Sequence, residues 1–256
     1  MRNDYNPYAQ QQPQNQNNSP GNLFPSLWGD EAELTKATSS CLARVFMRMF
    51  AALLVTAGVS YGISQIPDLF ILIYSNMFIF FAIVIAQFGL VMFLSARVMT
   101  MSPAVSNFMF FLYAILTGVT LSFVFVLYLP GLIFQAFAVT ALTFTAMAVY
   151  GTITKRDLTG IGAIAMMALF GIIIASFVNF FFQNDMVTIA INYIGVIIFV
   201  ALTAFQTQKI KNMLAEAHVA DQHEAIAQIS VIGALMLYLS FINLFLRILQ
   251  ILGRRR

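Results

Sequence analysis

Four polar residues near the end of the chain fall on one face of an otherwise apolar segment. At positions i, i+3, i+7 and i+10 stand Ser240, Asn243, Arg247 and Gln250. This spacing places the four side chains along a single stripe of an α-helix. A hydroxyl, two amides and a guanidinium can bind polar groups, but they supply neither an acid nor a base at neutral pH. The stripe predicts a polar inner face, used either for hydrogen bonds between helices or for a small-ion pathway.

Two other apolar segments carry polar residues of the same kind. Gln87 lies in the middle of one of them, and Arg97 stands at its end. The face of the other consists of Asn192, Gly195, Thr203 and Gln206. Polar groups at membrane depth face protein or water, so we expect these three segments to meet around a shared polar interior. On these residues alone, interhelical hydrogen bonding is favoured over conduction.

Acidic and imidazole side chains are confined to the N-terminal stretch and to the connections between apolar segments. His218 and His223 both lie in the polar stretch before the last segment. The acidic residues are Asp4, Asp30, Glu31, Glu33, Asp68, Asp157, Asp185, Glu216, Asp221 and Glu224. Proton relays, intramembrane metal sites and intramembrane proteases need such groups at membrane depth. We therefore expect no enzyme, no metal and no cofactor.

Composition places the chain in a membrane. Sixty per cent of its residues are apolar and only 9% are charged, whereas a soluble domain has about 25% charged residues. The net charge of +3 comes from basic residues at the ends of apolar runs, a pattern that does not indicate nucleic-acid binding. The single cysteine, Cys41, excludes an intramolecular disulfide.

The positions of the charges divide the apolar part into segments long enough to cross a bilayer, for which about 20 residues are needed. Seven helices are predicted, at residues 46–66, 70–94, 106–128, 132–152, 161–182, 187–207 and 227–251. In the first of them, Gly58 and Gly62 form a GxxxG pattern that predicts close packing. Residues 1–40, rich in Gln, Asn and Pro, are predicted to be a disordered tail, followed by a transmembrane domain over residues 41–256.

Lys and Arg residues occur at alternate connections, which predicts a cytoplasmic N-terminus. Connections around Asp68, Pro130 and Asp185 contain neither residue type. The rule fails only at the C-terminus, where seven full crossings would place three arginines, residues 254–256, outside. Either the last segment is re-entrant, or a seventh span has a basic outer end.

Three stretches resemble the transmembrane Bax-inhibitor-motif family, the Bax inhibitor-1-like proteins, especially the bacterial members. They are AVYGTITKRDLTGIG (148–162), ALTAFQTQKIK (201–211) and GALMLYLSFINLFLRILQILGRR (233–255). The resemblance covers about residues 40–256. It implies a bundle of seven transmembrane helices, or six plus a re-entrant segment, around a central C-terminal helix, in a bacterial inner membrane. It also implies links to cytoprotection, to a pH-dependent calcium leak and, in some bacterial members, to restraint of a membrane AAA protease.

The resemblance also identifies the positions of an acid-operated gate, and here all three acids are replaced. The aspartate of the family string TAxDTQKIK falls on Gln206, and that of LYLDFINLF falls on Ser240. A third family acid matches Gln87, and the latch arginine matches Arg97. Neutral side chains cannot change charge with pH, and calcium sites are built largely from carboxylates. The chain is therefore predicted to lack the gate, which leaves a pathway that is either permanently unlatched or inactive.

Two functions follow from the resemblance. The first is a non-enzymatic regulator of stress tolerance or quality control that acts through membrane partners such as a membrane AAA protease. The alternative is a calcium or small-ion leak through segments 70–94, 187–207 and 227–251, without the acid-operated gate. The loss of carboxylates weakens the second.

Overall fold

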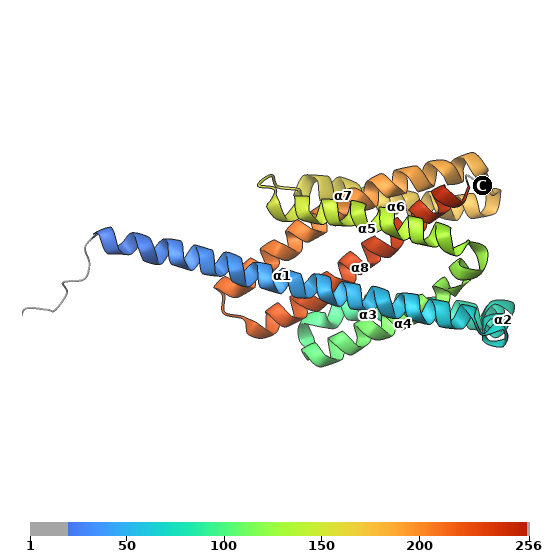
Figure 1. The fold of residues 1–256 in the computed structure, drawn as a ribbon, viewed down its shortest axis with the longest axis horizontal. Coiled ribbons are helices and arrows are strands. Elements are labelled where there is room, and N and C mark those ends of the chain that lie inside the picture. Colours follow the sequence, from blue (N-terminus) through green and yellow to red (C-terminus); the bar gives the residue numbers. More distant parts are fainter. Residues whose placement is uncertain (1–19, 255–256) are drawn as a thin grey trace, which may run out of the picture.

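The computed structural model describes residues 20–254, with side chains from Glu33 onward. In this part the chain forms eight α-helices and one short 3-10 turn, and no strand. The elements are α1 (Pro20–Ser64), α2 (Pro67–Ser75), α3 (Met77–Arg97), η1 (Val98–Thr100), α4 (Pro103–Leu127), α5 (Pro130–Ile153), α6 (Thr159–Phe182), α7 (Asp185–Val219) and α8 (His223–Gly253) (Figure 1).

Seven of these helices, α1 and α3 to α8, are long and apolar enough to cross a membrane. The prediction of an all-α membrane protein with seven spans is confirmed. The last helix, α8, runs unbroken for 31 residues, which corresponds to about 46 Å at 1.5 Å per residue. A helix of that length is long enough to cross a bilayer, and it does not turn back between His223 and Gly253, which favours a seventh span over a re-entrant segment.

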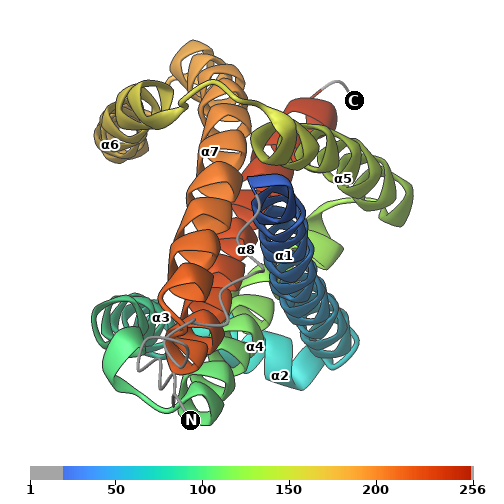
Figure 2. The ribbon, with the colours of Figure 1, turned by 90° about the vertical axis from the view of Figure 1, so that its left-hand side faces the viewer.

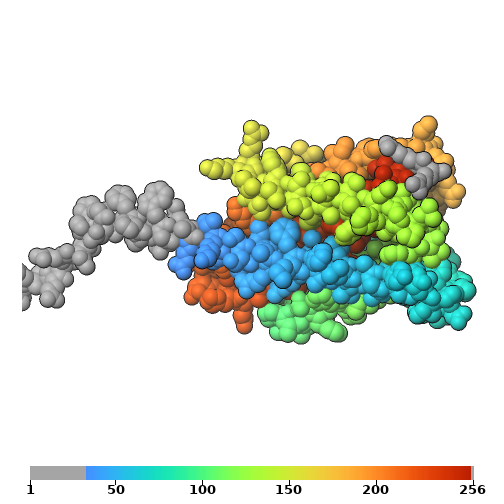
Figure 3. Space-filling view, in the orientation of Figure 1, coloured from blue at the N-terminus to red at the C-terminus, as the bar shows by residue number. Residues whose placement is uncertain are grey.

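Helix α8 is the centre of the bundle, as predicted. In its most apolar stretch 67% of the residues are buried, against 6% for α3. It packs against α1, α4, α5 and α7, and Figure 2 shows these helices around it. The space-filling view shows the middle of α8 largely hidden behind α1 and α5 (Figure 3). Of the polar stripe of α8, Ser240 is buried and Asn243, Arg247 and Gln250 are half-buried, so the stripe faces other helices for the most part.

The predicted span 70–94 is present as α3, but its predicted start is wrong, because the chain breaks at Asn76. The Asn76 side chain accepts hydrogen bonds from the backbone N–H groups of Phe78 and Ile79, at 3.1 and 3.4 Å, and so caps the start of α3. The preceding residues form the separate short helix α2 (Figure 1). The Tyr74 hydroxyl holds α2 against α4 by donating to the carbonyl oxygen of Thr120 at 3.0 Å. Asn76 is uncharged, so the positions of charges could not reveal this break.

Two helices extend by several turns beyond the predicted spans. Helix α7 continues to Val219, and α1 begins at Pro20, before the predicted end of the tail at residue 40. The stretch EAELTKA, residues 31–37, consists mostly of good helix formers, which accounts for the long α1. Residues 1–19 lie outside the described part of the chain, so the disordered tail stays a prediction there.

The GxxxG pattern of α1 does not mark a close contact within the bundle. Gly58 and Gly62 are exposed, and a Cβ at either would meet no described atom within 4 Å. The close approach of α1 is instead to Gly118 of α4, where a Cβ would lie 2.8 Å from the carbonyl oxygen of Thr56. The glycine that allows α1 to pack closely is therefore Gly118 on α4, and not one of the two glycines of α1.

Candidate functional site

A cavity of about 910 Å³ lies between α3 and α4 on one side and α6, α7 and α8 on the other. Figure 2 shows α3 and α6 on the same side of the bundle, well separated, with α7 between them. Most of the wall is apolar. The polar side chains that line its inner part include Gln87, Thr120, Gln206, Ser240, Asn243 and Arg247. Five of these six residues were singled out from the sequence.

Gln206 and Ser240, the two replaced gate positions, are in direct contact. The Ser240 hydroxyl donates a hydrogen bond of 2.8 Å to the Gln206 side-chain oxygen, joining α8 to α7. Ser240 is buried and Gln206 is half-buried. Both partners are neutral at every pH at which the protein is folded, so this contact cannot act as a titratable switch.

Gln87 faces the same cavity from α3 but bonds to a different helix. Its amide nitrogen donates to the Thr120 hydroxyl of α4 at 3.0 Å, and Thr120 in turn donates to the Thr117 carbonyl oxygen. Helix α3 packs mainly on α4. The three expected segments thus border one cavity, with α3 lying across it from α7 and α8.

Four other predicted site residues do not line the cavity, namely Asn192, which is described below, and Arg97, Gln250 and Thr203. Arg97, the expected latch cation, is exposed in the last turn of α3 and does not line the cavity. Gln250 is half-buried and lies outside it as well. Thr203 is fully buried, and its hydroxyl donates back to the Phe199 carbonyl oxygen of its own helix at 2.7 Å. The stripe of α8 therefore contributes its first three members only.

Asn192 lies beyond the cavity, toward the ends where α7 begins and α8 finishes. Its side-chain oxygen accepts a hydrogen bond of 3.0 Å from the Arg247 guanidinium. Gly195, one turn further along α7, lies beneath the arginine stem, since a Cβ there would be 3.3 Å from the Cδ and Nε atoms of Arg247. Asn243 lines the cavity, while its amide nitrogen donates to the Leu239 carbonyl oxygen at 2.8 Å.

The charge of the cavity is opposite to that of a cation site. Among residues 33–254, no Asp or Glu lines it, whereas Lys209 and Arg247 do. In the same part of the chain, no group of three or more His, Cys, Asp and Glu residues could hold a metal ion. Calcium prefers six to eight oxygen ligands that include carboxylates. A calcium ion would meet amide and hydroxyl oxygens here, together with two positive charges.

Sequence reasoning missed the contribution of α4. Tyr113, Thr117 and Thr120 all line the cavity, and their spacing of four and three residues places them on one helical stripe. That spacing was a usable signal. Threonines in apolar helices are ambiguous, however, because they commonly bond to their own backbone, as the Thr117 hydroxyl does to the Tyr113 carbonyl oxygen at 2.9 Å.

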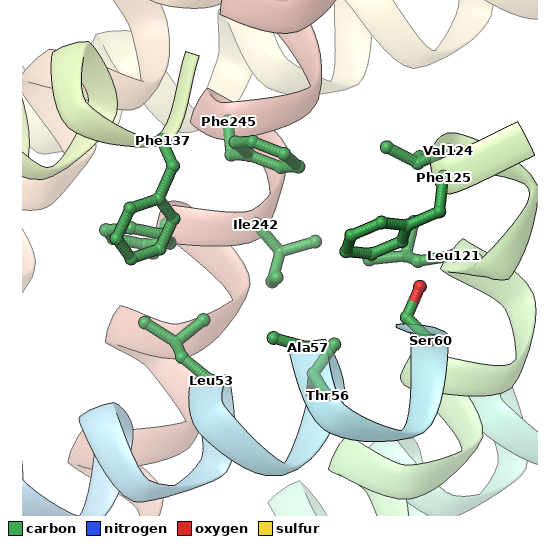
Figure 4. A pocket seen from close by; sticks show the side chains of 11 residues that line it. Leu53, Thr56, Ala57, Ser60, Leu121, Val124, Phe125, Phe137, Ile242 and Phe245 are labelled. Atoms are coloured by element: carbon green, nitrogen blue, oxygen red, sulfur yellow. The ribbon is translucent and has the colours of Figure 1, made fainter. Parts of the chain in front are cut away.

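A second, smaller hollow lies between α1, α4, α5 and α8 (Figure 4). Its volume is about 60 Å³, and its wall is apolar apart from Thr56 and Ser60. Figure 4 shows Ser60 of α1 facing Leu121 and Phe125 of α4. This hollow is too small and too apolar to hold a polar solute, and it lies apart from the polar residues of the large cavity.

Beside this hollow, a buried hydrogen bond ties the central helix to α1 and α4. The Tyr238 hydroxyl lies 2.7 Å from the Thr56 hydroxyl, which donates to the Ala114 carbonyl oxygen at 2.9 Å. We expect Tyr238→Phe to lower the free energy of unfolding by about 1 kcal/mol, because the Thr56 oxygen loses its buried donor. Thermal unfolding in detergent measures this. The control is Tyr61→Phe, at an exposed tyrosine, and equal losses in the two variants would contradict the prediction.

Comparison with known proteins gives one family and several relatives. Residues 38–256 match the family model described as "Inhibitor of apoptosis-promoting Bax1". "Inner membrane protein YbhL" of Escherichia coli K12 is 44% identical over 215 residues, which cover 84% of this chain and 92% of that protein. An uncharacterized protein of Deinococcus radiodurans is 38% identical over 210 residues, or 82% of this chain and 88% of its own length. An uncharacterized membrane protein of Streptococcus pyogenes serotype M3 is 33% identical over 221 residues, which cover 83% of this chain and 93% of that protein.

Proposed function

The chain belongs to the Bax inhibitor family of multi-pass membrane proteins, and on that premise we propose that it is a non-enzymatic regulator of stress tolerance or quality control. It acts through membrane partners, of which a membrane AAA protease is the example that the resemblance implies. Its place is the bacterial inner membrane, consistent with the name of the Escherichia coli relative, with the N-terminus in the cytoplasm.

The observation that carries this proposal is the neutral contact between Gln206 and Ser240. A calcium leak controlled by pH needs carboxylates at these positions, and the Ser240 hydroxyl bonded to the Gln206 amide provides none. Lys209 and Arg247 make the cavity around the contact positive. The site therefore favours a role that does not depend on cation transport.

Helix α1 supports a role in binding partners, because it runs on beyond the bundle. Figure 1 shows its first part projecting away from the other helices. Thr38 is the first buried residue of the described side chains, and the residues from Glu33 to Ala37 are exposed or half-buried. A projecting helix on the cytoplasmic side is well placed to reach the soluble domain of a membrane-bound partner.

Removal of residues 2–37 tests the regulator. We expect the truncated chain to keep the folded bundle, since no described side chain before Thr38 is buried, and to lose its co-purifying membrane partners. Affinity purification followed by mass spectrometry identifies the partners, and gel filtration reports the fold. A version in which a Gly/Ser linker of equal length replaces residues 2–37 separates loss of sequence from loss of length. The same partners on the truncated and intact chains would contradict a role for this segment.

The second candidate is a small-ion leak, and the large cavity favours it. Gln87, Gln206 and Ser240 from three helices border about 910 Å³ of space at membrane depth. The purified chain in liposomes, without any partner, distinguishes the two functions. A regulator gives no flux above that of empty liposomes, whereas a leak gives the same flux with or without residues 2–37.

A further inference from the structure

Arg247 is a cation inside a membrane-spanning helix, and it has no acidic partner. Within residues 33–254, the two ion pairs are His223–Asp221 and Arg254–Asp185, and neither includes Arg247. The guanidinium makes a single hydrogen bond, to the neutral side-chain oxygen of Asn192. A cation at membrane depth is costly unless it is paired or hydrated, so its remaining donors need a partner.

The bundle is shaped to hold this arginine where it stands. Gly195 of α7 leaves room for its stem, because a Cβ there would come within 3.3 Å of two Arg247 side-chain atoms. The hydrogen bond to Asn192 then fixes the direction of the guanidinium. An arginine that merely reached toward solvent would need neither the gap nor the amide.

Two hollows meet at Arg247. The first is the large cavity, which the arginine borders at one end. The second has a volume of about 360 Å³ and lies between α6, α7 and α8, near the beginning of α7. Arg247 precedes Arg254 by seven residues, or about 10 Å along α8, so it lies near the end of the span and within reach of the lipid headgroups. The proposed orientation places this end of the bundle on the outer side of the membrane.

The smaller hollow is lined by polar side chains and by one charge of each sign, those of Arg247 and Asp185. It is lined by Ser176 and Asn179 of α6 and by Thr188 of α7. The Ser176 hydroxyl oxygen is buried and, among the described residues, has no hydrogen-bond partner. Asp185 also lines this hollow, but Arg254 neutralises it through a contact of 3.0 Å. The uncompensated charge is that of Arg247.

The large cavity adds an apolar wall that reaches the lipid-facing surface. Phe88 of α3 and Ile173 of α6 line it and are 66% and 55% exposed. Since these exposed side chains of α3 and α6 border the cavity, it opens toward the acyl chains of the bilayer. An occupant that suits both parts carries an anionic head and a hydrocarbon chain.

We propose that Arg247, held in place by Asn192, binds together with Ser176 the phosphate headgroup of an anionic phospholipid whose acyl chain lies in the cavity between α3 and α6. The arginine fork suits a phosphate, which accepts charge-assisted hydrogen bonds from it. The headgroup end of this site lies apart from the gate positions, whereas the acyl chain shares the large cavity with Gln87, Gln206 and Ser240. On this proposal, the folded protein carries a specifically bound phospholipid.

Lipid binding to the purified full chain tests this site. Native mass spectrometry measures the occupancy with phosphatidylglycerol, with phosphatidylcholine of the same acyl chains, and with inorganic phosphate alone. We expect the chain to prefer phosphatidylglycerol over phosphatidylcholine by about tenfold. The glycerol headgroup is uncharged, so the lipid keeps the negative charge of its phosphate, whereas the choline cation cancels that charge and would lie near Arg247. Arg247→Gln removes this preference, whereas Arg247→Lys retains part of it. Arg156→Gln, at an exposed loop cation, retains it fully.

A second variant keeps the test decisive if Arg247→Gln does not fold. Ser176→Ala removes a hydroxyl that bonds to no described residue, so the fold loses little, and we expect phosphatidylglycerol binding to weaken about threefold. Equal binding of the two lipids to the unaltered chain would overturn the proposal. Unchanged preference in Arg247→Gln would overturn it as well. Full occupancy by inorganic phosphate alone would assign the site to a free anion and overturn the lipid assignment.

Discussion

Gly151→Val is expected to prevent the accumulation of folded protein. Gly151 is buried on α5, and a Cβ there would overlap the backbone carbonyl group of Ala204 on α7. A backbone carbonyl in a packed helix cannot move aside as a flexible side chain can, so the two helices would have to separate. We expect a loss of about 3 kcal/mol or more, the upper end for overpacked interiors. Detergent gel filtration and thermal unfolding measure the result.

Gly58→Val is the matched control for this substitution. It makes the same change of residue type inside a long helix, but a side chain at Gly58 meets no described atom within 4 Å. Its expected effect on stability comes only from helix propensity, and it is a small gain, because valine forms helix more readily than glycine. Similar thermal stabilities of the two variants would show that α5 and α7 do not approach as closely as the structure has them.

The contrast between Gly58 and Gly151 shows what a sequence can predict about helix packing. The GxxxG spacing of Gly58 and Gly62 predicts a close contact that the bundle does not make, whereas Gly151 stands in no such pattern and is in tight contact. Close approach needs a small residue on one helix only, opposite a backbone that the sequence does not identify. Tertiary arrangement therefore decides which glycines are essential.

The number of spans was predictable, because charges are excluded from the hydrocarbon core. Gaps between Lys, Arg, Asp and Glu residues predicted seven spans, and seven helices long enough to cross are present. The break at Asn76 was not predictable in this way, since a capping amide carries no charge. Boundaries that depend on single hydrogen bonds are lost in an argument from charge.

The candidate site was predicted in part. Spacing placed Ser240, Asn243 and Arg247 on the inner face of α8, and all three line the cavity. Their partners could not be read from spacing, because contacts between helices depend on rotation and depth. The Asn192–Arg247 bond is an example. Arg97 was assigned from the family pattern alone, and it lies exposed at the end of α3.

The double variant Gln206→Asp with Ser240→Asp is expected to make stability depend on pH. The Ser240 hydroxyl and the Gln206 oxygen are 2.8 Å apart, so two carboxyl groups at these positions would face each other at hydrogen-bonding distance. Two carboxylates that close cannot both be ionised, and the pair retains a shared proton in the folded state. In the unfolded chain both would ionise above a pKa of about 3.9.

The direction of the effect follows from the number of bound protons. Above the unfolded value the folded double variant holds more protons than the unfolded chain, so its free energy of unfolding falls as pH rises. We expect a loss of about 3 kcal/mol between about pH 4 and pH 6, because a displacement of about two pH units for one proton is lost as pH rises from the unfolded to the folded value. The unaltered Gln206–Ser240 contact contributes no such change, because neither group ionises.

Thermal unfolding between about pH 4 and pH 8 and calcium flux in liposomes measure the two consequences together. Each single variant serves as a control, because one carboxyl group beside a neutral amide or hydroxyl can ionise without a like-charged neighbour. If the cavity is an intact pathway, the double variant also acquires a calcium flux that changes with pH. A calcium flux through the unaltered chain that rises several-fold from about pH 8 to pH 6 would contradict the premise that this chain lacks an acid-operated gate. It would mean that some group other than residues 206 and 240 is the switch.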